Sequence, residues 1–282
     1  MNNDPAFARL AGLFDVGLLA DAKVLVAGCG SGGSQVALQL VMSGIRNFTL
    51  IDNDVLEIEN VIRHACGRRY LGQRKVDALE DLLRDRNPEI AVAKHDVDLM
   101  SEPELAGLIR NSSVVILATD NDATRYKINE LCVELTKPFV TGRVFTRGIG
   151  GEVFSYHPHE TGCLACLESV LERTTLREGV REIDLVSEDE REKMYGLEIA
   201  EIKDSPGLNI DIAFITSFHT RLVLDTIAKG LPDRPKFLPP LEHNYFVWGN
   251  RPIPPFSRHF ELQKIDLKPQ QGCLVCGPAN PA

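Results

Sequence analysis

The stretch that decides the fold is KVLVAGCGSGG, residues 23–33. Its first five residues are mostly apolar and predict a short buried strand. The glycines Gly28, Gly30 and Gly33 follow with the spacing G-x-G-x-x-G, and the apolar segment 34–44 (SQVALQLVMSG) predicts a helix. A strand that passes through a glycine-rich turn into a helix is typical of nucleotide-binding βαβ units, in which the first glycine permits a tight turn and the third allows close packing of the helix. The sequence therefore predicts that a phosphate group binds at the N-terminus of this helix.

Strands and helices continue to alternate beyond this unit. Residues 48–51 predict a second strand, and Asp52 at its end stands about twenty residues past the glycine loop, where a carboxylate can bind ribose hydroxyls. Further strands are predicted at 90–94, 114–118 and 139–141. Such alternation indicates a doubly wound, Rossmann-like α/β fold with a mainly parallel sheet.

The pattern changes in the second half of the chain. GIGGEVFSYHP (148–158) predicts a strand pair or a bend rather than another strand-helix unit. Two late strands are predicted near 245–248 and 259–262, on either side of the proline-rich NRPIPPF, and we expect them to extend the sheet in an antiparallel sense. The segment 205–230 has a long apolar helical face, which we expect in the core and in a dimer interface.

Two Cys-x-x-Cys pairs occur in nearly identical knuckles, GCLAC with Cys163 and Cys166, and GCLVC with Cys273 and Cys276. One pair supplies only two of the four ligands of a tetrahedral zinc ion, so the second pair is its natural completion. A site closed by four thiolates has no open position and is structural. The alternatives are four free cysteines or a dithiol redox pair.

Composition restricts the class of protein. The 282 residues are 44% apolar and 25% charged, as in a globular protein, and the net charge of -9 argues against nucleic-acid binding. No apolar run approaches the length of a membrane span, and the N-terminal residues do not resemble a signal peptide. Cysteines with zinc-type spacing suit a reducing compartment, so we expect a cytoplasmic protein.

Polar motifs follow Asp52 in IDNDVLEIENVIRHACG (51–67), GQRKVDALEDLL (72–83) and LATDND (117–122). They add a carboxylate at Asp54, cations at Arg63 and Lys75, and an acid at Asp120 after a predicted strand. An NAD-dependent oxidoreductase is the rival interpretation of the glycine loop, but it needs no such pair of cations. An enzyme that cleaves ATP between the α and β phosphates needs cations on the triphosphate and a carboxylate for Mg²⁺.

At these residues the chain resembles the ubiquitin-activating superfamily, specifically its bacterial adenylyltransferases of the ThiF, MoeB and HesA type. The shared motifs are the glycine loop, D-x-D, N-x-x-R, G-x-x-K, T-D-N and both zinc knuckles, in this order. The resemblance covers residues 1–166 well and 205–276 more loosely. It implies a single adenylation domain over 1–282, whose parts are a helical arm (1–22), a nucleotide-binding core (23–162), the knuckles (163–166 and 273–276), an acidic crossover (167–207), and a C-terminal helix and strands (208–272).

The resemblance implies that the enzyme uses ATP and Mg²⁺ to activate the C-terminal carboxylate of a ubiquitin-like or sulfur-carrier protein, usually ending in Gly-Gly, as an acyl-adenylate. It implies Asp52 on the ribose, Asn60, Arg63 and Lys75 on the phosphates, and Asp120 on Mg²⁺. The further nucleotide contacts assigned in this way are Gly28, Gly30, Ser31, Gly33, Asp54, Gln73 and Asn121.

A homodimer is also implied, in which an N-terminal arginine of one subunit reaches the ATP of the other. Arg9 is the one arginine before the glycine loop and inherits that catalytic role, beside Arg63, Lys75 and Asp120. A downstream conjugating enzyme or sulfur donor would then receive the activated carrier. The sequence leaves conjugation and sulfur transfer open, and a catalytically inactive nucleotide-binding scaffold remains a further alternative.

The chain departs from its relatives at several positions. Ser31 stands where they commonly carry glycine, and His64 where many carry glutamine. Many relatives have a cysteine in the crossover, whereas residues 167–272 here contain none. Cys66, close to Arg63, is the remaining candidate nucleophile, and we expect instead that the adenylate passes directly to a partner.

The crossover is strongly acidic, with twelve acids and six bases between residues 168 and 204. It is either a solvated helical excursion with close ion pairs or an acidic bed for a basic protein tail. Asp120 is also expected to cap the helix predicted over 121–135.

Overall fold

The structure is a computed structural model that describes residues 5–10, 13, 15–145, 148–172, 208–253 and 256–277. Most of the acidic crossover, residues 173–207, lies outside the described residues, so neither interpretation of its charge is addressed.

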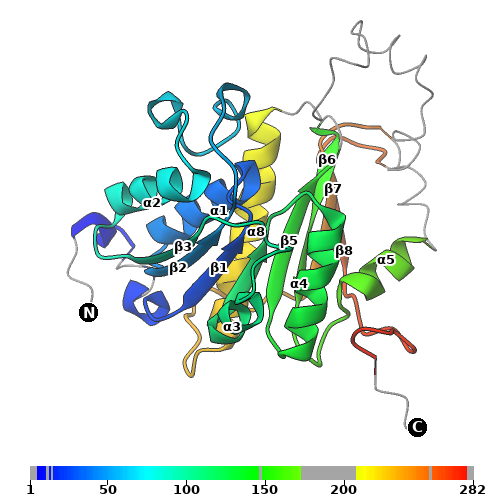
Figure 1. Cartoon of the computed structure of the whole chain (residues 1–282). Coiled ribbons are helices and arrows are strands. Elements are labelled where there is room, and N and C mark those ends of the chain that lie inside the picture. Colours follow the sequence, from blue (N-terminus) through cyan, green and yellow to red (C-terminus); the bar gives the residue numbers. More distant parts are fainter. Residues whose placement is uncertain are drawn as a thin grey trace, which may run out of the picture.

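An eight-stranded sheet with the order β3-β2-β1-β4-β5-β6-β7-β8 forms the centre of the molecule (Figure 1). The five strands from β3 to β5 are parallel, and β6, β7 and β8 continue the sheet in an antiparallel sense. This confirms the predicted fold class. The strands are β1 (Lys23–Ala27), β2 (Asn47–Ile51), β3 (Ala91–His95), β4 (Val114–Leu117), β5 (Phe139–Val144), β6 (Gly150–Tyr156), β7 (Tyr245–Gly249) and β8 (Glu261–Ile265).

Helices cover both faces of the sheet (Figure 1). One face carries α1 (Ser31–Met42), α2 (Lys75–Arg86) and α8 (Asn209–Lys229), and the other carries α3 (Leu105–Asn111), α4 (Asp122–Glu134) and α5 (Leu164–Glu172). Short 3-10 turns are η1 (Pro5–Phe7), η2 (Val16–Leu19), η3 (Ile58–Asn60) and η4 (Arg68–Tyr70).

Strand β1 shows why the sheet needs both layers. Its side chains alternate, with Val24 and Val26 in the core under α1, α2 and α8, and Leu25 and Ala27 in the core under α3, α4 and α5. A strand that is apolar on both faces has to be covered on both. None of the helices within the described ranges is long and apolar enough to cross a membrane.

Three element boundaries differ from the predictions. Helix α1 begins inside the glycine loop at Ser31, because Gly30 already has the extended conformation of an N-cap. Residues 150–156 form one strand, β6, rather than a strand pair. The last strand begins at Glu261 instead of residue 259, since Phe260 has a positive φ of 56° and cannot lie in a strand.

Candidate functional site

A cavity of about 680 Å³ lies at the carboxyl ends of the parallel strands. Gly28 follows β1, Asp52 follows β2, Asp98 comes after β3 and Asp120 comes after β4, and all four residues line it. In the sheet, β2 lies on one side of β1 and β4 lies on its other side, so the strand order reverses direction at β1. Open α/β sheets bind their ligands at such a switch point.

The glycine loop forms one wall of the cavity. Gly28 has a φ of 95°, which favours glycine, and a Cβ on Gly33 would lie 1.9 Å from the Gly28 carbonyl oxygen. Gly33 therefore allows α1 to pack against the loop, as predicted, and it does not itself line the cavity. Gly30 caps α1 without any side-chain hydrogen bond, so the first backbone N–H groups of the helix can bind an anion.

Asp52 connects this wall to the loop after β2. Its Oδ2 accepts a hydrogen bond from the Cys29 N–H at 2.7 Å, and its Oδ1 accepts one from the Asp54 N–H at 2.9 Å. Burial raises the pKa of Asp52, and these hydrogen bonds oppose the rise. The carboxylate is thus held in one orientation at the edge of the cavity.

Lys75 is the buried cation of the site. It begins α2, its side chain is 11% exposed, and its Nζ lies 2.6 Å from Asp54 Oδ2. Its backbone N–H also donates to the Asp54 carbonyl at 2.9 Å. The first turn of α2 and the loop after β2 therefore hold the ammonium group against the cavity.

The segment that includes η3 and the residues after it brings Asn60, Arg63 and His64 to the wall of the cavity. Asn60 Oδ1 accepts from the Glu57 N–H in a capping box, which leaves its amide NH₂ as a donor. Gln35 on α1 donates to the Arg63 carbonyl at 2.9 Å, and so ties this segment to the helix behind the glycine loop.

His64 links the same segment to the glycine loop. The Cys66 N–H donates to His64 Nδ1 at 3.0 Å, so Nε2 carries the proton and donates to the Cys29 carbonyl at 2.7 Å. Burial lowers the pKa of His64 to about 4. The neutral imidazole is therefore a fixed bridge between the glycine loop and the segment after η3.

The loop after β4 corrects one prediction. Asn121, not Asp120, caps α4, because Asn121 Oδ1 accepts from the Thr124 N–H at 3.1 Å. The helix begins one residue later than a cap at Asp120 would require. The Asp120 carboxylate lines the cavity without serving as the helix cap.

Most predicted nucleotide contacts meet in this one cavity. Those that line it are Gly28, Gly30, Ser31, Asp52, Asp54, Asn60, Arg63, Lys75, Asp120 and Asn121. Gln73 is exposed and does not line it; its backbone carbonyl accepts from the Leu56 N–H instead. Arg9 is exposed and also lies outside the lining of this cavity.

Sequence reasoning missed the wall formed by Val97, Asp98 and Leu99. These residues follow β3, which is paired in parallel with β2, so they lie beside Asp52 at the same edge of the sheet. These residues form no motif of their own. The one feature of the sequence that could have indicated them is that they directly follow a predicted parallel strand.

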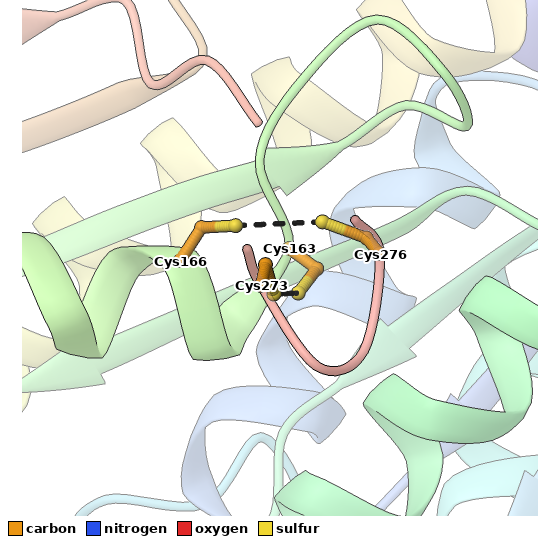
Figure 2. Close-up of side chains that lie close together, drawn as sticks. All are labelled: Cys163, Cys166, Cys273 and Cys276. Atoms are coloured by element: carbon orange, nitrogen blue, oxygen red, sulfur yellow. Dashed lines mark hydrogen bonds between the residues drawn. The ribbon is translucent and has the colours of Figure 1, made fainter. Parts of the chain in front are cut away.

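The four predicted zinc ligands come together from distant parts of the chain (Figure 2). Cys163 and Cys166 lie at the start of α5, and Cys273 and Cys276 lie on the loop near the C-terminus, with the sulfur atoms turned toward one another. The Sγ atoms of Cys163 and Cys273 are 3.8 Å apart, those of Cys166 and Cys276 are 3.4 Å apart, and all four lie within 4.8 Å of one another. None of them lines the cavity at the carboxyl ends of the parallel strands.

The remaining three cysteines are all buried. Cys29, Cys66 and Cys132 are each 0% exposed, and burial raises the pKa of Cys66 and of Cys132 to about 12. Cys66, the candidate nucleophile close to Arg63, is therefore closed to solvent. A thiol of this kind is inert unless the surrounding structure opens.

Comparisons with known proteins match the chain to one family model and to several relatives. A family model described as "ThiF family" matches residues 7–236. The adenylyltransferase and sulfurtransferase MOCS3-2 of Zea mays is 35% identical over 150 residues, 53% of this chain and 30% of that protein. The molybdopterin-synthase adenylyltransferase of Escherichia coli K12 is 32% identical over 159 residues, 56% of this chain and 63% of its own length. The matched part thus spans less than two thirds of either relative.

Solved structures of E. coli MccB have the same fold. MccB with ATP superimposes with a TM-score of 0.67 and 20% identity, covering 93% of this chain and 68% of that one. MccB with AMPCPP and selenomethionine MccA gives a TM-score of 0.70 with 19% identity, covering 98% of this chain and 75% of that one.

Proposed function

Because this chain belongs to the ThiF family, we propose that it is an ATP-dependent adenylyltransferase that activates the C-terminal carboxylate of a ubiquitin-like or sulfur-carrier protein. The observation that carries the proposal is the convergence of Arg63, Lys75 and Asp120 on one cavity beside the N-terminus of α1. Two cations and a carboxylate at that position suit a triphosphate with its metal ion.

In the proposed reaction, a carboxylate oxygen of the carrier attacks the α-phosphorus of ATP. A new oxygen–phosphorus bond gives the acyl-adenylate, and the bond to the β-phosphate breaks with its electron pair leaving on pyrophosphate. The attacking carboxylate is already ionised, so no side chain has to remove a proton. Arg63, Lys75 and the N–H groups of α1 would stabilise the charge that develops on the phosphates.

Asp120 is the residue to which we assign the bound Mg²⁺. Its carboxylate lines the cavity, and oxygen ligands are what this ion prefers. When bound, Mg²⁺ would neutralise phosphate charge. Asp52 would bind the ribose hydroxyls, while Val97 and Leu99 offer apolar surface for the base.

We infer that the four cysteines hold zinc. Zinc–sulfur bonds of about 2.3 Å in a tetrahedron place the sulfur atoms about 3.8 Å apart, close to the 3.8 and 3.4 Å separations across the cluster. Four thiolates leave no open coordination position, so the ion would be structural and would join the start of α5 to the C-terminal loop.

The relatives' names favour a sulfur-carrier protein as the substrate, with a sulfur donor acting next, over a conjugation system with a conjugating enzyme. With Cys29, Cys66 and Cys132 buried, we propose that the carrier-adenylate passes directly to a partner. The whole chain would then act as one adenylation domain, and its reduced cysteines suit the cytoplasm.

We further propose a homodimer. Ile62, Leu208, Ile210 and Phe214 are 73%, 61%, 72% and 40% exposed. Asn209 Nδ2 donates to the Ile62 carbonyl at 3.1 Å, so the segment just after η3 and the start of α8 meet at this apolar surface. It adjoins Arg63, which would let an N-terminal residue such as Arg9 of a second copy approach the phosphates. Sedimentation of the wild type and of Ile210→Asp tests this, and a monomeric wild type would contradict it.

The function is tested by ATP–pyrophosphate exchange with Mg²⁺ and a sulfur-carrier protein ending in Gly-Gly. We expect exchange that depends on the carrier and on its terminal carboxylate. Tight binding of NAD without any response to ATP would favour the oxidoreductase. Binding of ATP without exchange, for every carrier of this class, would favour the inactive scaffold. The presence of Arg63, Lys75 and Asp120 together in the cavity argues against a scaffold, which has no need of all three.

A further inference from the structure

A second cavity of about 350 Å³ adjoins the cavity at the carboxyl ends of the parallel strands, which we call the nucleotide cavity because of the proposed function, and it lies on the side toward α8. The two cavities share part of their walls, including Ser31, Gly32 and Arg63. The second, which we call the side cavity, is also lined by residues of α4, β5 and α8. It therefore begins beside the residues to which we assign the phosphates. A substrate that attacks the α-phosphate would have to approach from a space of this kind.

His219 of α8 lines the side cavity and has one defined tautomer. It is 2% exposed, and its Nε2 lies 3.0 Å from the Val140 carbonyl oxygen. A carbonyl only accepts, so Nε2 carries the proton and Nδ1 is an acceptor. Burial lowers the pKa of His219 to about 4, which keeps the ring neutral at pH 7.

The acceptor Nδ1 faces β5 at Gly142, which also lines the side cavity. A Cβ on Gly142 would lie 3.0 Å from Nδ1, so any side chain at this position would crowd the acceptor. Among the residues that the structure describes, no donor is hydrogen-bonded to Nδ1. Within the described part of the chain, the buried His219 side chain thus keeps an unpaired acceptor at the wall of a cavity that adjoins the proposed phosphate site.

We propose that His219 Nδ1 is a specificity-determining acceptor that binds a backbone N–H in the last two residues of the carrier's tail. The inference rests on the proposed function and identifies how the tail is recognised. An extended peptide offers one N–H per residue, and terminal glycines would bring no side chain into the side cavity that His219 and Gly142 line. A ligand that covers Nδ1 without supplying a donor leaves it unpaired, which weakens binding.

The probe is acetyl-Gly-Gly joined to adenosine through a sulfamate, a stable mimic of the acyl-adenylate. Two analogues each replace one of its two amides by an ester, which removes a single N–H and keeps the shape. We expect one ester to bind the wild type about three- to tenfold more weakly, as for the loss of one hydrogen bond. Adenosine sulfamate without glycines reports on the nucleotide cavity alone.

Two variants separate an acceptor from a structural role. His219→Asn places an acceptor, Oδ1, near the position of Nδ1 but loses the hydrogen bond to the Val140 carbonyl. His219→Gln keeps a donor that reaches the Val140 carbonyl but moves the acceptor away from the position of Nδ1. We expect His219→Asn to retain the difference between amide and ester and His219→Gln to lose it, with adenosine sulfamate bound equally by both.

Equal binding of the amide and both esters by the wild type would overturn the inference, and so would a His219→Gln variant that still discriminates. In either case, tight binding of the glycyl probe relative to adenosine sulfamate would leave the proposed function standing. If the wild type binds none of these adenosine compounds, the proposed function itself fails.

Discussion

Lys75 Nζ lies 2.6 Å from Asp54 Oδ2, with the lysine side chain 11% exposed and the aspartate side chain 62% exposed. A buried ammonium group requires a counter-ion, and Asp54 supplies one from the solvent side. The cation is therefore positioned at the cavity before any anionic ligand arrives, and a triphosphate would join Asp54 as a second partner.

Removal of this cation, or of Arg63, should slow the chemical step. We expect Lys75→Ala and Arg63→Ala to lower the rate of ATP–pyrophosphate exchange by about 10²–10³-fold, as for loss of a donor to transition-state charge. Lys94 is a suitable control, because it pairs with Asp77 and Glu80 outside the cavity. Equal rates for Lys75→Ala and Lys94→Ala would remove Lys75 from the mechanism.

Asp120→Ala should abolish Mg²⁺-dependent exchange and leave the melting temperature nearly unchanged. The reason is that Asn121, not Asp120, caps α4, so the substitution removes a metal ligand without uncapping the helix. Asp233, which is exposed and outside the cavity, provides the control variant Asp233→Ala. Exchange that survives in Asp120→Ala at saturating Mg²⁺ would assign the metal to another residue.

One zinc ion per chain should be found by elemental analysis, and the double variant Cys273→Ser/Cys276→Ser should lose it. We expect a lower melting temperature with little change in nucleotide affinity, since the cluster lies outside the nucleotide cavity. Leu274→Ala is the matched control, because this fully exposed side chain stands between the two ligands. Zinc retained by the double variant would exclude the assignment.

Stability should fall as the pH drops from about 6.5 toward 4. Burial lowers the pKa of His64 and of His219 from 6.5 to about 4, so the unfolded chain binds more protons in this window and the free energy of unfolding decreases with acidification. Each histidine contributes on the order of 3 kcal/mol, given about 1.4 kcal/mol per pKa unit.

Urea unfolding at several pH values measures this effect. His64→Gln should reduce the pH dependence between 6.5 and 4, because glutamine can donate to the Cys29 carbonyl without titrating. The exposed His259 provides the control His259→Gln, which should match the wild type. Identical pH profiles for all three proteins would show that His64 is not the titrating group.

No thiol-sensitive carrier adduct should form on this chain. Enzyme, ATP and a Gly-Gly carrier should yield the adenylate alone, and Cys66→Ala should change the exchange rate little, because the thiol is buried and its pKa is raised. A reducible carrier–enzyme band that disappears in Cys66→Ala would make Cys66 a nucleophile.

The amino-acid sequence by itself determined the local chemistry of this protein. The glycine loop predicted the turn at Gly28 and the close packing at Gly33. Both depend only on the backbone conformation of a few consecutive residues, which the local sequence specifies. The alternation of strands and helices predicted the parallel sheet, and a parallel sheet brings the carboxyl ends of its strands, with Asp52 and Asp120, to one edge. The matching knuckles predicted a shared four-cysteine cluster, and its sulfur atoms do converge.

Only the tertiary structure decided which side chains are buried and what they face. Nothing in the neighbouring residues of Cys66 shows that it is closed to solvent, and nothing near His219 in the sequence shows that its Nδ1 lies against Gly142. The wall at Val97 and Leu99 likewise depends on β3 pairing with β2. These properties arise from contacts between segments far apart in the chain, where packing rather than local conformation sets the distance between atoms.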